Sequence, residues 1–124
     1  MSITSIQNVT NGRSKSIMFI NTETSGNNRT IDPRRTVGVG NCWIPWCTNE
    51  RDFPAHHLEV IEVDSGAVLW YIWQQRAFDG DFIRISTDGF KTPEPAHVID
   101  GSADVGHSYN LYVDDAGVAT GDSQ

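Results

Sequence analysis

The feature that most constrains this chain is the way its apolar residues are grouped. They come in short runs separated by Gly, Pro, Asn, Asp and Ser, and no stretch shows the spacing of an amphipathic helix. Short apolar runs divided by turn residues are typical of sandwiches and barrels. We therefore predict an all-β fold, an antiparallel β-sandwich or jelly-roll-like barrel, in which residues 1–124 form a single domain.

The clearest local prediction is a hairpin. Two apolar runs, Leu58–Asp64 and Ala67–Gln74, flank the pair Ser65-Gly66, which suits a two-residue turn. Alternation along the second run predicts two apolar faces, one with Val68, Trp70 and Ile72 and the other with Leu69, Tyr71 and Trp73. One face can cover the core, and the other must be covered by something else.

Several further elements are predicted from the remaining runs and turn residues. The other predicted strands are Ile3–Val9, Ser16–Ile20, Thr36–Val39, Phe82–Ser86, Tyr109–Val113 and a short one at Val118. The pair Asn11-Gly12 suits a type I′ turn after the first strand. A polar loop is expected at Glu23–Asn28, and a turn at Asp32–Arg35, where Pro33 fixes φ.

The charge of the chain excludes some partners. The net charge is −7, and from Val63 onward ten acidic residues oppose three basic ones. A surface of this sign repels phosphate backbones and anionic lipid headgroups, so we expect no nucleic-acid partner. No apolar run approaches the roughly 20 residues that span a bilayer, so we expect no transmembrane segment. The first residues resemble no signal peptide, which predicts a cytoplasmic protein with Cys42 and Cys47 reduced. Because the two cysteines are close in the sequence, a local disulfide between them stays open.

The segment Cys42–Cys47 is the most unusual stretch of the sequence. Pro45 suits the second position of a turn that spans Ile44–Cys47. The flanking Trp43 and Trp46 then form an aromatic platform on which a sugar ring stacks, or they cap one end of the core. Both interpretations remain open from the sequence.

Our leading hypothesis is a non-enzymatic, lectin-like recognition domain that binds a glycan or another neutral polar ligand. Aromatic rings take the apolar face of a sugar, while carboxylates accept protons from its hydroxyls. The predicted ligand-binding residues are Trp43, Trp46, Tyr71, Trp73, Asp52, Asp79 and Asp81.

Two other function classes stay open. The first is a protein-interaction module in which the face with Leu69, Tyr71 and Trp73 forms a homo-oligomer interface, where aromatic residues are enriched. The second is a small hydrolase or metal-dependent enzyme built around Asp52, His56 and His57. No nucleophile elbow, P-loop or His-Glu-x-x-His motif is present, so we predict no catalytic residue.

The only cofactor that the sequence suggests is calcium, bound weakly. Carboxylates cluster in Asp100–Gly106, but Val105 and Leu111 stand where an EF-hand loop needs Gly and Glu. We therefore predict no dedicated metal site.

Overall fold

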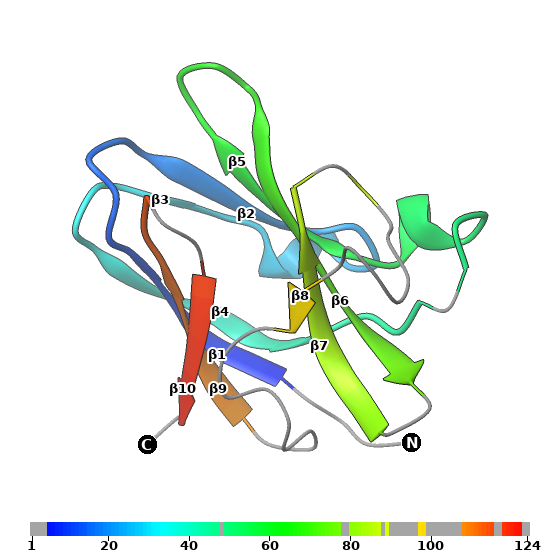
Figure 1. Cartoon of the computed structure of the whole chain (residues 1–124). Coiled ribbons are helices and arrows are strands. Elements are labelled where there is room, and N and C mark those ends of the chain that lie inside the picture. Colours follow the sequence, from blue (N-terminus) through cyan, green and yellow to red (C-terminus); the bar gives the residue numbers. More distant parts are fainter. Residues whose placement is uncertain are drawn as a thin grey trace.

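Two β-sheets make up the part of the chain that the computed structural model describes, residues 5–47, 49–77, 80–87, 89, 97–98, 108–115 and 118–122. The four-stranded sheet runs in the order β10-β9-β1-β4, and the six-stranded sheet in the order β3-β2-β5-β6-β7-β8. Figure 1 shows the strands of the two sheets as two layers. The predicted all-β fold is therefore correct, and of its two forms the structure is a β-sandwich.

The strand bounds agree broadly with the predicted runs. The four-stranded sheet consists of β1 (Ser5–Asn11), β4 (Thr36–Trp43), β9 (Ser108–Val113) and β10 (Val118–Asp122). The six-stranded sheet consists of β2 (Ile17–Asn21), β3 (Arg29–Ile31), β5 (Leu58–Glu62), β6 (Val68–Ala77), β7 (Gly80–Ser86) and β8 (His97–Val98). Two short 3-10 helices complete the elements, η1 (Ser25–Asn27) and η2 (Phe53–Ala55). No helix in the described ranges is long and apolar enough to cross a membrane.

The main core lies between the two sheets. Side chains on a strand alternate between its faces, so each sheet turns every second residue toward the other sheet. Residues that the four-stranded sheet contributes include Ile6, Val9, Val39, Leu111 and Val113. Residues that the six-stranded sheet contributes include Ile17, Phe19, Val60, Trp70, Ile72 and Ile83. The buried cluster is continuous across the two layers.

The predicted hairpin is confirmed, with a longer connection. β5 pairs antiparallel with β6, and Leu58 stands opposite Ile72. β5 ends at Glu62 and β6 begins at Val68, so the loop is longer than the pair Ser65-Gly66. Gly66 has a φ of 72°, and its amide donates to the Glu62 carbonyl at 2.8 Å. Glycine is favoured there because a side chain strains this left-handed conformation.

The predicted turns have different outcomes. At 32–35 the chain does turn, because the Arg35 amide donates to the Asp32 carbonyl at 3.2 Å. The type I′ turn at Asn11-Gly12 is wrong, since neither residue has a positive φ. β1 pairs with β4 and β9, whereas β2 belongs to the other sheet. The connection therefore crosses between layers, which the local turn preference of Asn-Gly does not reveal.

Candidate functional site

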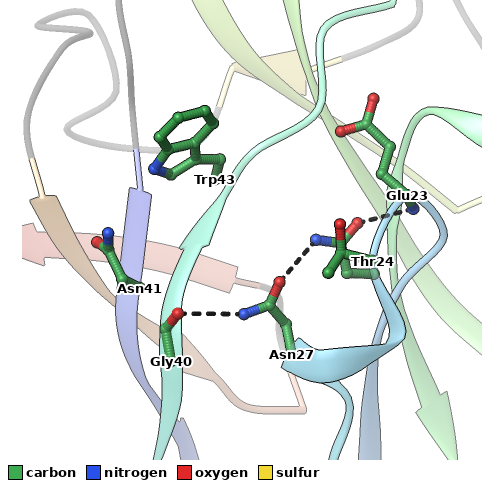
Figure 2. A pocket seen from close by; sticks show the side chains of 7 residues that line it. Glu23, Thr24, Asn27, Gly40, Asn41 and Trp43 are labelled. Atoms are coloured by element: carbon green, nitrogen blue, oxygen red, sulfur yellow. Dashed lines mark hydrogen bonds between the residues drawn. The ribbon is translucent and has the colours of Figure 1, made fainter.

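An open pocket of about 350 Å³ lies between β4 and the segment that follows β2. Its lining residues are Asn21, Glu23, Thr24, Asn27, Gly40, Asn41 and Trp43. Figure 2 shows Trp43 on the β4 side and Glu23 on the facing side, with Asn27 between the two walls. The pocket therefore combines an aromatic ring, a carboxylate and several amides.

A β-bulge in β4 shapes one wall of this pocket. Ile6 pairs with Cys42 and Asn8 with Gly38, so the single residue Gln7 stands opposite the stretch Val39–Asn41. Gly40 and Asn41 have φ values of 73° and 55°. Glycine adopts this left-handed region freely, and asparagine visits it more readily than most residues with a side chain. The Gly40-Asn41 pair thus allows the strand to bulge.

The bulge decides that Trp43 faces outward. In a regular strand, alternation from the buried Val39 would turn residue 43 inward as well. The bulge shifts the alternation by one residue, so Cys42 is fully buried and Trp43 is 58% exposed. This also corrects the predicted strand end at Val39, because β4 continues to Trp43. A ring this exposed gains most burial only when a ligand covers it.

The side chain of Asn21 forms the floor of the pocket. Its Nδ2 donates to Asn27 Oδ1 at 3.0 Å and contacts Cys42 Sγ at 3.5 Å. Its Oδ1 accepts the backbone amide of Glu23 at 2.9 Å. Since these contacts use its donors and its acceptor, Asn21 holds the wall in place and is not available to a ligand.

Asn27, at the end of η1, connects the two walls. Its Nδ2 donates to the carbonyl of Val39 at 2.7 Å and to that of Gly40 at 3.3 Å. The dashed lines in Figure 2 show the contact with Gly40. These are the carbonyls that the bulge takes out of regular pairing, and a buried carbonyl without a partner would be destabilising. Asn27 therefore stabilises the bulge and the position of Trp43.

Other lining side chains keep polar atoms that have no partner among the described residues. They are Glu23, Thr24, Asn41 and Trp43. Glu23 uses only Oε2, which lies 2.6 Å from Nδ1 of His56, so its Oε1 is left for a ligand. Asn41 accepts a hydrogen bond from Gln7 through Oδ1, so its Nδ2 is left. The pocket thus offers both acceptors and donors.

Cys42 lies beneath the pocket as a buried thiol. Burial raises its pKa to about 12, the hydrogen bond from Asn21 opposes this shift, and the negative charge of Glu23 adds to it. Burial also raises the pKa of Cys47. Both cysteines are free. Because the thiolate is the nucleophile, neither cysteine is activated at neutral pH.

Trp73 and Tyr71 belong to a second aromatic group, on the other face of β6. Trp73 is 0% exposed, and its ring meets that of Phe53 edge-on, with centroids 5.1 Å apart. Cys47 is buried in the same cluster, against which the half-buried Tyr71 packs. Of the face predicted to be uncovered, Tyr71 and Trp73 are covered by the segment around η2. Leu69 instead packs against the main core, because the pairing of β5 with β6 is irregular next to it. The structure leaves Trp73 without surface for a ligand or an interface.

His57 is a buried member of this second group. Its ring stacks on Phe53 with centroids 4.3 Å apart and an interplanar angle of 8°. Its Nδ1 lies 2.6 Å from the carbonyl oxygen of Phe53, and its Nε2 lies 2.7 Å from Oε2 of Glu59. A carbonyl oxygen only accepts, so Nδ1 carries a proton. Both ring nitrogens are thus engaged, and His57 has no nitrogen left to act as a general base.

The residues of the hydrolase hypothesis do not converge. Asp52 is exposed, and its carboxylate accepts from Asn49 at 3.1 Å and lies 3.7 Å from Arg51. His56 instead contacts Glu23. In the described ranges, no group of three or more His, Cys, Asp and Glu could hold a metal ion. The predicted calcium-binding stretch, Asp100–Gly106, lies outside the described residues.

Trp46 and Asp52 lie apart from the described lining of the pocket. The stretch around Trp46 is extended and forms no turn, because it pairs with Gln74, whose amide donates to the Pro45 carbonyl at 2.8 Å. Trp46 is half-buried there, and it and Asp52 do not line the pocket. Asp81 lies in β7 opposite Arg76, and Asp79 falls outside the described residues. Of the predicted binding residues, the described pocket lining contains Trp43.

The lining residues that sequence reasoning missed come from two places. Glu23, Thr24 and Asn27 lie in the polar loop at 23–28, and Asn41 lies in the bulge. The Gly-Asn pair is a usable signal for a bulge, whereas nothing local indicates that the loop at 23–28 faces β4.

Comparison with known proteins adds no assignment: no family model, no curated protein and no solved structure matches the chain.

Proposed function

We propose that this protein is a lectin-like recognition domain that binds a glycan in the Trp43 pocket. The observation that carries the proposal is the exposed ring of Trp43 beside polar atoms that have no partner in the described structure. A sugar ring has an apolar face of C–H groups and an edge of hydroxyls, and the pocket offers a complement to each.

The hydrogen-bonding capacity of the pocket suits hydroxyl groups. A hydroxyl both donates and accepts, so it can give its proton to Glu23 Oε1 and receive one from Asn41 Nδ2. Thr24 carries a hydroxyl that can do either. Since Asn21 and Asn27 already fix the walls, little ordering is required on binding, which favours affinity.

The size and openness of the pocket favour the end of a glycan. Its volume of about 350 Å³ is at the lower end of the range for small-molecule sites. An open site of this size holds a terminal sugar residue while the rest of the chain extends into solvent.

Replacement of Trp43 by alanine tests the proposal. We expect Trp43→Ala to weaken glycan binding at least tenfold, because an aromatic anchor is the residue type whose truncation is most damaging to a binding site. A glycan array identifies the ligand, and calorimetry then measures the Kd for the parent and the variant. The melting temperature should change little, since the ring is mostly exposed.

Tyr112→Ala is the matched control. Tyr112 is 44% exposed on β9 and does not line the pocket, so its removal deletes an exposed aromatic ring elsewhere. Equal loss of binding in the two variants would contradict the proposal, as would a parent protein that binds no glycan on the array.

A further inference from the structure

The described lining of the Trp43 pocket carries a negative charge and no positive charge. Among the described lining residues Glu23 is the only charged one, and its Oε1 has no partner in the described structure. Arg29 is not a lining residue, and Nη1 of its guanidinium donates at 2.8 Å to the carbonyls of Gly26 and Asn28. The pocket therefore presents a carboxylate that no lining base neutralises.

An ammonium group fits this arrangement better than a hydroxyl does. An ammonium has three N–H donors, which can bind the free oxygen of Glu23, and it has no acceptor atom that would need a donor from the pocket. Figure 2 shows Trp43 and Glu23 on facing sides of the pocket. The indole is therefore the surface for the apolar face of the sugar ring, and the carboxylate is the partner for the ammonium.

We infer that the Trp43 pocket selects sugar residues that carry a free amino group, with the ammonium at Glu23 and the ring against Trp43. This inference rests on the proposed glycan binding and names the ligand class. N-acetylation removes the charge and the preference with it. Sialylated or sulfated glycans are disfavoured, because the chain carries a net charge of −7 and Glu23 repels an anion.

The experiment compares a hexose, the matching free hexosamine and its N-acetyl form at pH 7 by calorimetry. We expect the hexosamine to bind about fivefold tighter than the neutral sugars, which is the size of effect expected for a partly exposed ion pair. In Glu23→Gln the ratio of the two Kd values should fall to about one. Asp64→Asn, which removes the same charge from an exposed turn, should keep the parent ratio.

The two proposals fail in different ways. If the neutral sugar binds through Trp43 and the hexosamine binds no tighter, the amino-sugar inference is overturned and the lectin function stands. If no sugar binds in any form, both are overturned. If Glu23→Gln and Asp64→Asn reduce the amine preference equally, the preference reflects the overall charge and not this pocket.

Discussion

The Trp43 pocket and the cluster around Trp73 contain similar residues but differ in what covers them. Each combines a tryptophan with a carboxylate, a histidine and a cysteine, yet Trp43 is 58% exposed and Trp73 is 0% exposed. In the cluster the segment around η2 closes over the rings, and His57 uses both ring nitrogens. In the pocket no described segment closes over Trp43. Residue types alone therefore do not separate a binding site from a core.

The strongest test of this contrast is the removal of each ring in turn. Trp73→Ala should lower the free energy of unfolding by about 3–5 kcal/mol, the usual effect of emptying a buried aromatic site. Trp43→Ala should lower it by less than about 1 kcal/mol, as surface substitutions do. Chemical denaturation of the two variants measures the difference. Similar losses would mean that both rings are core residues.

The thiol below the pocket gives a pH-dependent test. The folded pKa of Cys42 is raised from 9.0 to about 12 by burial, so the unfolded chain loses its proton first as the pH rises. The stabilisation is complete below about pH 9 and is lost progressively between about pH 9 and pH 12. At pH 10.5 the free energy of unfolding should be lower by about 2 kcal/mol. This pH is 1.5 units above the unfolded pKa of 9.0, and each unit corresponds to about 1.4 kcal/mol.

Cys42→Ala isolates this contribution from other groups that titrate at high pH. Denaturation of parent and variant at pH 8 and pH 10.5 should show a smaller pH dependence in the variant. An unchanged dependence would contradict the burial of the Cys42 thiol.

The smallest expected effect concerns the connection between the pocket walls. Asn27→Ala removes the donor to the carbonyls of Val39 and Gly40, which should lower the free energy of unfolding by about 1–2 kcal/mol. Glycan affinity should fall with it, because the position of Trp43 depends on the bulge. Asn110→Ala removes an amide hydrogen bond on β9, with Asn8, at a site that does not line the pocket. It should leave the glycan Kd unchanged, and equal loss of affinity in both variants would contradict a specific role for Asn27.

The fold was predictable because its signals are local. The hairpin of β5 and β6 is encoded by two adjacent apolar runs and a glycine with a φ of 72°. The alternation within β6 correctly separated Trp70 and Ile72 from Trp73, which lie in different buried clusters. Such periodicity needs no knowledge of the rest of the chain.

The site was predictable only in part, because it depends on contacts between distant segments. Trp43 was predicted as a ligand-binding residue and lies in the pocket lining, but its outward direction follows from the bulge between β1 and β4. Trp46 is three residues further along the chain yet pairs with Gln74 of the other sheet. Glu23 gave no signal, since a polar loop residue becomes part of a pocket only when β4 packs beside it.

The bulge at Gly40-Asn41 also bears on how the protein avoids aggregation. Among the described strands β4 pairs only with β1, so it forms an outer edge of the four-stranded sheet. An exposed edge offers free carbonyls and amides to a strand from another molecule. Here the irregular backbone interrupts that template, and Asn27 already occupies two of its carbonyls. The bulge that turns Trp43 outward therefore also discourages copies of the chain from joining edge to edge.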